Sequence, residues 1–240
     1  MIIRRIEHKS SSIGIRVAVA SDLHGTDFNE PVSLLKSEKP DIIVCPGDIF
    51  EMRDGLSKEK KELINRNGYR FLSAASKIAP TFFSRGNHDA FPTDFEYREI
   101  ERTGAVILDG SMQEEKGILI GGLGSGGSNR YFKSTNSPDN AEFLKDFANK
   151  PGFKLLLCHH PEYYDEYIKP LPIDLTVCGH AHGGQWVIFG KSIFAPGQGL
   201  FPKYVSGEYD GGRLVVSRGM GGLTWIPRIA NPCEIIIISL

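Results

Sequence analysis

Metal-binding side chains gather just after apolar runs in this sequence. Six of its seven histidines closely follow short runs of apolar residues, and aspartate or asparagine residues stand near them. One histidine in such a place is most often a half-buried side chain without a special role. Six in the same setting favour a shared site. The residues concerned are Asp22, His24, Asp48, Asn87, His88, Asp89, His159, His160, His180 and His182.

Nitrogen and oxygen ligands of this kind suit borderline divalent metals such as Zn, Mn, Fe, Co and Ni. Even two Asp, one Asn and four His from this set are too many ligands for one ion. They suit two ions about 3.5–4 Å apart that share a carboxylate and a bridging hydroxide. Two divalent cations keep a net charge of about +1 after two carboxylates and the hydroxide are counted, which attracts an anion such as a phosphate ester. A structural metal site would instead be closed.

The apolar runs before these side chains have the composition of strands that are covered on both faces. Open α/β sheets bind ligands beyond the carboxyl ends of such strands, which is where the polar side chains stand. The sequence predicts strands at residues 16–20, 41–45, 81–83, 153–158 and 174–178. Apolar spacing, caps and stops predict helices at residues 29–38, 57–78, 93–104, 139–150 and 161–168. Asn29 is the expected cap of the first helix, while Thr93 and Asp139 open capping boxes.

Further strands are predicted between and after these elements. Residues 105–108 and 117–120 have strand character and are spaced as a hairpin. The runs 186–189, 192–195, 213–217 and 234–240 are joined by short glycine-rich links, which favour antiparallel pairing. Alternating strands and helices up to residue 178, followed by this antiparallel end, indicate an α/β fold. Because neither a repeat nor a linker interrupts the pattern, we expect a single domain over residues 1–240.

Residues 121–138 form the one long irregular segment, rich in Gly, Ser and Asn, with Arg130, Tyr131 and Lys133 inside it. A loop of this length in a compact domain is either a mobile lid beside the site or a plain surface loop, and the sequence leaves both open. A phosphate cradle is disfavoured, because no Gly-Lys-Ser/Thr ends the segment.

The overall composition is that of an ordinary soluble globular protein, with 40% hydrophobic and 24% charged residues. A formal net charge of -1 gives no basis for general nucleic-acid binding. The four cysteines have no CxxC spacing and are expected to be buried and reduced. No stretch approaches the roughly 20 apolar residues of a membrane span, and no export signal is recognisable, so we expect a cytoplasmic protein.

Five short motifs resemble, in order, those of the calcineurin-like metallophosphoesterase superfamily. The order is specific even though each motif alone is common. The motifs are Asp22-Leu23-His24, Gly47-Asp48, Gly86-Asn87-His88-Asp89, His159 and Gly179-His180-Ala181-His182. Three further stretches are similar to the small bacterial phosphodiesterase-like branch of that superfamily. They are Leu157-Cys158-His159-His160-Pro161, Gly183-Gly184-Gln185 and Ser217-Arg218-Gly219.

The resemblance implies a four-layer α/β/β/α sandwich of two mixed β-sheets flanked by helices, and a centre of two divalent transition-metal ions. Mn is favoured over Fe and Zn. The implied ligands are Asp22, His24 and His182 for the first ion, Asn87, His159 and His180 for the second, and Asp48 as the bridge. His88 is implied as a proton donor beside the leaving group, with Asp89 orienting its imidazole. A metal-bridging hydroxide would attack phosphorus in line. The pattern assigns no ligand role to His160.

Arg85 resembles the arginine that contacts phosphate in protein Ser/Thr phosphatases, so it is a candidate substrate-binding residue. An exposed or helix-end role is the alternative. Those phosphatases continue their Gly-Asp motif with Asp-Arg-Gly, whereas Asp48 is followed by Ile49-Phe50-Glu51. Protein phosphatase activity is therefore disfavoured.

The sequence predicts a dinuclear metal-dependent phosphoesterase for a small phosphodiester, pyrophosphate or phosphomonoester, with a diester favoured over a monoester. A non-catalytic metal-binding scaffold and a nuclease of the same superfamily are the alternatives. A lipid-linked substrate is also compatible with the aromatic, glycine-rich residues 200–225. The sequence indicates no particular oligomeric state.

Overall fold

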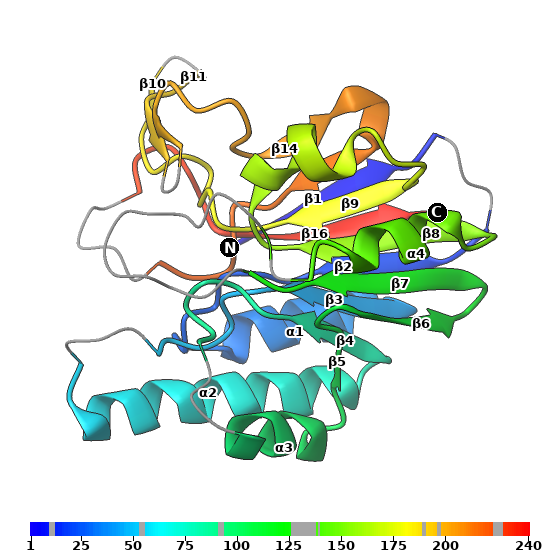
Figure 1. The fold of residues 1–240 in the computed structure, drawn as a ribbon. Coiled ribbons are helices and arrows are strands. Elements are labelled where there is room, and N and C mark those ends of the chain that lie inside the picture. Colours follow the sequence, from blue (N-terminus) through cyan, green and yellow to red (C-terminus); the bar gives the residue numbers. More distant parts are fainter. Residues whose placement is uncertain are drawn as a thin grey trace.

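The computed structural model describes residues 1–9, 13–52, 56–90, 94–125, 138, 140–188, 191–195, 198–222 and 228–240. Within these residues, two mixed six-stranded sheets pack face to face, with helices outside both (Figure 1). This is the α/β/β/α sandwich that the family resemblance implies. No helix of the described ranges is both long and apolar enough to cross a membrane.

The first sheet has the strand order β1-β16-β2-β3-β4-β5. Its strands are β1 (Ile2–Glu7), β16 (Glu234–Ser239), β2 (Arg16–Val19), β3 (Ile42–Pro46), β4 (Thr81–Ser84) and β5 (Val106–Ile107). Strands β2 to β5 are parallel, β16 is antiparallel to β2, and β1 is parallel to β16. The carboxyl ends of β2, β3 and β4 therefore meet at one edge of the sheet.

The second sheet has the order β14-β15-β9-β8-β7-β6. Its strands are β14 (Gly207–Tyr209), β15 (Leu214–Val216), β9 (Leu175–Cys178), β8 (Phe153–Cys158), β7 (Ile118–Leu123) and β6 (Ser111–Glu115). The four central strands are parallel and the two outer ones antiparallel. Two small ribbons follow β9, formed by β10 (Val187–Ile188) with β11 (Lys191–Ser192) and by β12 (Phe194–Ala195) with β13 (Gly199–Leu200).

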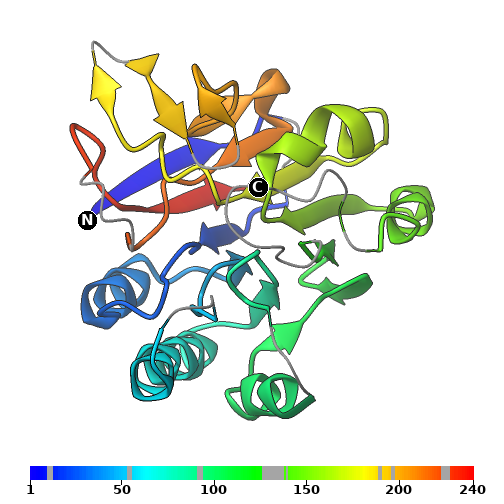
Figure 2. The ribbon, with the colours of Figure 1, turned by 60° about the vertical axis from the view of Figure 1, so that its left-hand side comes forward.

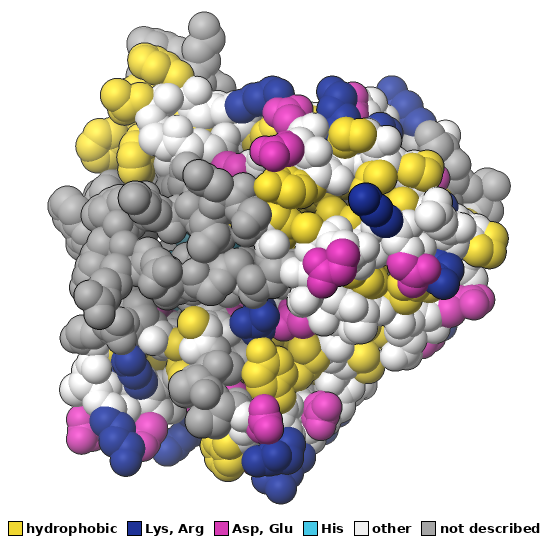
Figure 3. Space-filling model, in the orientation of Figure 1, with side chains coloured by type: hydrophobic (Ala, Val, Ile, Leu, Met, Phe, Trp, Pro, Cys, Tyr) yellow, Lys and Arg dark blue, Asp and Glu magenta, His cyan; other side chains and the backbone are white. Residues whose placement is uncertain are grey.

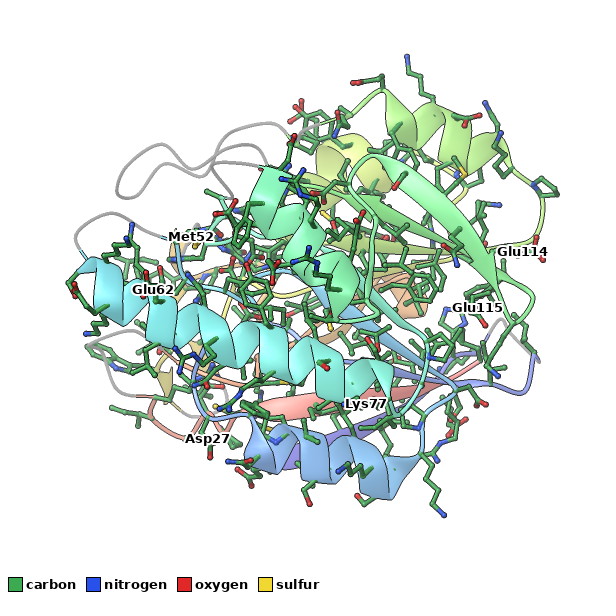
Figure 4. All side chains as sticks on the ribbon, turned by 90° about the horizontal axis from the view of Figure 1, so that it is seen from below. Asp27, Met52, Glu62, Lys77, Glu114 and Glu115 are labelled. Atoms are coloured by element: carbon green, nitrogen blue, oxygen red, sulfur yellow. The ribbon has the colours of Figure 1, made fainter. Side chains whose placement is uncertain are left out.

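Helices cover the outer face of each sheet (Figure 2). The first sheet carries α1 (Asn29–Glu38), α2 (Lys58–Ser76) and α3 (Asp94–Arg102), and α1 and α2 lie side by side in Figure 4. The second sheet carries α4 (Phe143–Asn149) and the short turns Pro161–Tyr163 and Tyr164–Ile168, and a further short turn lies at Asp210–Gly212. Position 68 inside α2 is occupied by glycine, since a Cβ there would come within 2.6 Å of the Phe50 ring.

Alternating side chains of each strand enter different cores, which explains the continuous apolar runs in the sequence. Val17 and Val19 of β2 belong to the core between the two sheets, whereas Ala18 packs in the core beneath α1 and α2. A third core lies between the second sheet and α4, and it includes Leu156 and Phe147. Strands buried on both faces need apolar residues at successive positions.

The structure corrects the predicted hairpin. Residues 106–107 form β5 and pair with β4 in the first sheet, whereas β7 pairs with β6 in the second. Strand β6 escaped prediction because it is an edge strand with polar residues, including Glu114 and Glu115 (Figure 4). Charged side chains on an edge strand block pairing with another chain.

The predicted antiparallel end is only partly correct. Strand β15 pairs in parallel with β9, and β16 pairs in parallel with β1. The sequence did not predict β1, in which two arginines interrupt the apolar residues at Ile2, Ile3 and Ile6. Whether a strand pairs in parallel or antiparallel depends on which distant strand lies beside it, and the local sequence does not indicate that neighbour.

Some local predictions are also corrected. Asn29 is the first residue of α1 and not its cap, since Phe28 occupies the cap position and offers no side-chain hydrogen bond. Thr93, Asp139 and residues 126–137, with Arg130, Tyr131 and Lys133, lie outside the described residues. All four cysteines are free thiols, and Cys45, Cys158 and Cys178 are buried as expected, whereas Cys233 is partly exposed.

Candidate metal centre

The edge where the two sheets meet brings the predicted metal ligands together. Three groups of side chains each place one ligand atom per residue within 4.8 Å of the others. The groups are Asp22, His24 and His182; His24, Asp48 and His88; and Asp48, His159 and His180. Because His24 and Asp48 are shared, the three groups form one continuous centre. The first and third match the ligand sets that the resemblance implies, apart from Asn87 and the bridging position.

Left-handed backbone is concentrated in this centre. Five of the predicted ligands have φ between 48° and 65°, a conformation that is costly for residues other than glycine. They are Asp22, His24, Asp48, His180 and His182. Backbone hydrogen bonds between neighbouring loops hold this geometry, including Asp22 N to Gly47 O at 3.0 Å and His24 N to Asp48 O at 2.9 Å. The loops are therefore shaped to point these side chains inward.

In the first group, three ligand atoms converge. His24 Nε2 lies 3.2 Å from His182 Nε2, which lies 3.7 Å from Asp22 Oδ1. The other carboxylate oxygen of Asp22 is buried without a hydrogen-bond partner. A buried carboxylate oxygen beside two imidazole nitrogens is the donor set expected for a divalent cation.

In the third group, His159 and Asp48 face each other. His159 Nε2 lies 3.0 Å from Asp48 Oδ2, and the opposite nitrogen, Nδ1, donates to the Pro46 carbonyl at 2.8 Å. A carbonyl fixing one imidazole nitrogen leaves the other to bind a metal. The buried Oδ1 of Asn87 and Nε2 of His180 have no hydrogen-bond partner. These unpartnered atoms fit a second cation, so the residues present suit a two-metal centre.

Electrostatics favour the metal-binding forms of Asp48, His180 and His182. They act the other way on two ligands: burial raises the pKa of Asp22, and Asp48 outweighs burial and raises the pKa of His159 to about 10. Burial opposes ionisation of Asp48, but the nearby His159 and His88 outweigh it and hold the pKa of Asp48 well below its usual range. Burial lowers the pKa of His180 and His182 well below the ordinary value, and neighbouring histidines add to the effect. An ionised carboxylate and neutral imidazoles are the forms that bind metal.

His88 contacts Glu51 rather than the predicted Asp89. His88 Nδ1 lies 2.9 Å from Glu51 Oε1, and Glu51 Oε2 lies 3.4 Å from His24 Nδ1. Burial acts against a charged imidazole, but Asp48 and Glu51 outweigh it and raise the pKa of His88 to about 9. Contacts with His24 and His88 outweigh the effect of burial and lower the pKa of Glu51 to about 2.

The predicted orienting role of Asp89 is therefore wrong. Its carboxylate accepts backbone N–H bonds from Asp48 at 2.6 Å, Phe50 at 2.9 Å and Gly86 at 2.8 Å. Asp89 thus ties the loop after β4 to the loop after β3, and acts on the position of Asp48. Glu51 follows Asp48 by three positions in the sequence, but nothing in the sequence indicates which imidazole a carboxylate in a loop will contact.

Arg228 is a second residue that the sequence did not single out. Its Nη2 lies 3.0 Å from His182 Nδ1, and its Nη1 donates to the His182 carbonyl at 3.3 Å. Asn231 Nδ2 donates to the same carbonyl at 2.6 Å. These contacts fix the orientation of the His182 ring from the side opposite His24.

Arg85 and His160 lie at the border of the centre. The Arg85 side chain is ion-paired with Asp109 and packs over the Tyr97 ring. Its contact with phosphate stays a prediction. His160 Nδ1 lies 2.8 Å from Ser125 Oγ, and burial lowers the pKa of His160 to about 3. His160 belongs to none of the three groups, and its lack of a ligand role stays a prediction.

Two glycines of the motifs are required by close approach. A Cβ on Gly86 would come within 2.2 Å of Asp48 Oδ1, and one on Gly179 within 2.4 Å of Asp22 Oδ2. Real Cβ atoms essentially never come this close to another heavy atom, so a side chain at either position would push a ligand carboxylate aside. The glycines of both motifs thus make room for the ligands.

The chain belongs to the calcineurin-like phosphoesterase family, whose model matches residues 15–184. It is 29% identical over 232 residues to an uncharacterized metallophosphoesterase of Campylobacter jejuni, covering 93% of this chain but only 57% of that relative. An uncharacterized metallophosphoesterase of Aquifex aeolicus is 28% identical and matches 94% of this chain and 85% of its own length. The phosphodiesterase YaeI of Escherichia coli is 29% identical, with coverage of 97% and 84%.

These relatives confirm the superfamily and its small bacterial branch. Together with the Asp and His groups, family membership supports a metal-dependent phosphoesterase.

Proposed function

We propose that the chain hydrolyses a phosphodiester, pyrophosphate or phosphomonoester at a dinuclear metal centre, with a diester favoured. The observation that carries the proposal is a pair of buried side-chain groups that lie next to each other where the two sheets meet. One group is Asp22, His24 and His182, and the other is Asp48, His159 and His180. Asp22 Oδ2, His159 Nε2 and His180 Nε2 are buried without a hydrogen-bond partner, which supports a ligand role for them.

Asp22, His24 and His182 would hold the first ion, and Asn87, His159 and His180 the second. Asp48 lies between the groups, with Oδ2 3.0 Å from His159 Nε2 and 3.8 Å from His24 Nε2, and would bridge the two ions. When bound, divalent ions such as Mn²⁺, our favoured metal, polarise phosphoryl oxygens and activate water.

His88 serves as the proton donor in this proposal. Its side chain is 26% exposed, whereas the neighbouring ligands are buried, so it borders the space through which a leaving group departs. Glu51 holds its Nδ1, which leaves Nε2 as the nitrogen that can meet substrate. The new P–O bond forms from water, the ester P–O bond breaks, and the leaving oxygen takes the proton of His88. Solvent then returns a proton to the ring.

The test is an assay of protein stripped of metal and reloaded with Mn²⁺, using matched chromogenic phosphate monoester and diester substrates. We expect metal-dependent turnover that is faster on the diester. Asp48→Ala should lose both turnover and bound metal, whereas Asp146→Ala, on the exposed surface of α4, should keep both. Two bound metals without turnover of either substrate would favour the scaffold alternative.

A further inference from the structure

Four large apolar side chains are exposed together beside the candidate metal centre. Trp186 is 40% exposed, Leu200 69%, Phe201 83% and Ile229 51%. Hydrophobic side chains gather at the top left of Figure 3, over the region of β10 and β11. Exposed apolar groups that cluster, rather than scatter, mark an interaction surface.

Backbone hydrogen bonds join the segments that carry these side chains. Val187 N donates to Ile229 O at 3.1 Å, Ile193 N donates to Trp186 O at 3.1 Å, and Phe201 N donates to Ile193 O at 2.9 Å. The four segments therefore lie side by side in the order 229, 186–187, 193–194 and 200–201. We call these segments the apolar lobe.

The conformation of Phe201 is a second sign of function. Its φ is 54°, in the left-handed region, where a bulky side chain is strained. Such strain persists where the surroundings impose it, and here the strain holds an aromatic ring in water and not in a core. Folding alone gives no reason to keep a phenylalanine in this place.

The charge of the surrounding chain is one-sided. Residues 183–207 contain no Asp or Glu but include Lys191 and Lys203, and residues 219–233 contain no acid but include Arg228. Lys203 is paired with Asp165 at 2.6 Å on the exposed surface, where such a pair contributes little. Asp165 is contributed by another part of the chain, whereas the segments of this surface include basic residues and no acid of their own. Such a surface complements an anionic, apolar partner.

We propose that the apolar lobe docks onto the surface of an anionic phospholipid bilayer. Tryptophan and phenylalanine side chains partition into the interface between headgroups and acyl chains, and basic residues attract anionic lipids. A second copy of the chain fits less well, since two such lobes would bring like charges together. Docking is a property of the surface and does not depend on the proposed phosphoesterase activity.

The lobe is firmly attached to the rim of the metal centre. His182 stands four residues before Trp186, and Arg228 and Asn231 on the Ile229 segment donate hydrogen bonds to His182. Docking would therefore bring the candidate metal centre close to the lipid headgroups.

The test is co-sedimentation with vesicles of equal parts phosphatidylcholine and phosphatidylglycerol, and with phosphatidylcholine vesicles alone. The wild type should bind the anionic vesicles more tightly. Leu200→Ser with Phe201→Gly should weaken this binding by about tenfold or more, because two apolar side chains no longer enter the interface. Glycine accepts a positive φ, so this variant should keep the melting temperature of the wild type.

The matched control is Leu63→Ser with Phe95→Ser, which changes exposed apolar residues on α2 and α3. It should bind vesicles as the wild type does. Equal loss in this control, or no binding of the wild type to anionic vesicles, would overturn the proposal. The wild type could instead form a concentration-dependent dimer and bind no vesicles. If the lobe variant then fails to dimerise while the control variant still does, the surface is an interface with a second copy of the chain. Metal-stripped wild type should bind vesicles equally well, which separates this result from the phosphoesterase assay.

Discussion

His88 Nδ1 and Glu51 Oε1 lie 2.9 Å apart, and the same carboxylate reaches toward His24 with its other oxygen, at 3.4 Å from His24 Nδ1. Glu51 is fully buried, so a single carboxylate orients both a candidate metal ligand and the candidate proton donor. Carboxylates behind catalytic or ligating imidazoles fix the ring and its tautomer.

Glu51→Gln should therefore lower kcat about tenfold to a hundredfold, while KM changes little. Glutamine fills the same space but has no charge to stabilise the imidazolium. Steady-state kinetics on the Mn²⁺-loaded protein would measure the effect, and Glu51→Asp should recover part of it. A variant with unchanged kcat would remove Glu51 from the mechanism.

His88→Ala should abolish most turnover and still retain both metal ions. The reason is that His88 Nδ1 is held by Glu51, and the two ligand sets are complete without this residue. Elemental analysis after gel filtration gives the metal content, with Asp48→Ala as the variant that should lose metal. An ion missing from His88→Ala would make His88 a ligand, in line with its place near His24 and Asp48.

Gly179→Ala should damage the first metal group. Its new methyl group would lie 2.4 Å from Asp22 Oδ2, so the carboxylate must move. We expect a loss of stability of about 1–3 kcal/mol and weaker metal binding. Gly222→Ala is the control, because its nearest contact would be an ordinary 3.4 Å. Urea unfolding and metal titration of both variants check the prediction, which fails if the two behave alike.

Glu162 should make stability fall with rising pH. Burial raises the pKa of Glu162 to about 7, and neither carboxylate oxygen has a hydrogen-bond partner. The folded state therefore binds a proton at Glu162 more tightly than the unfolded state does. The contribution of this proton to the free energy of unfolding is lost as pH rises from about 4.5 through 7. Glu162→Gln should be more stable than the wild type by up to about 3 kcal/mol near pH 8 and equal to it near pH 4. Equal melting curves at both pH values would contradict the assignment.

The sequence predicts well what local pattern decides. Strand β8 begins at Phe153 and ends at Cys158 as expected, because apolar residues at successive positions are needed between two cores. The predicted ligands lie together because they follow parallel strands, whose carboxyl ends share an edge.

What the sequence could not predict depends on how distant segments meet. Glu51 and Arg228 stand in loops, and their contacts with His88 and His182 exist only once the chain has folded. The predicted orientation of the His88 ring by Asp89 is wrong for the same reason. Asp89 is next to His88 in the sequence, but its carboxylate contacts backbone N–H groups and not the ring. Strand β6 was missed because an edge strand needs few apolar residues.

The position of β16 has a consequence for synthesis. This strand lies between β1 and β2, although it is the last of the sheet to be made. On the ribosome, β1 and β2 emerge long before their shared neighbour, and neither can pair on that side until residues 234–239 have left the exit tunnel. A nascent chain stalled earlier presents two open strand edges, which are the sites at which unfinished chains associate. The first sheet is thus completed only after β16 has been made.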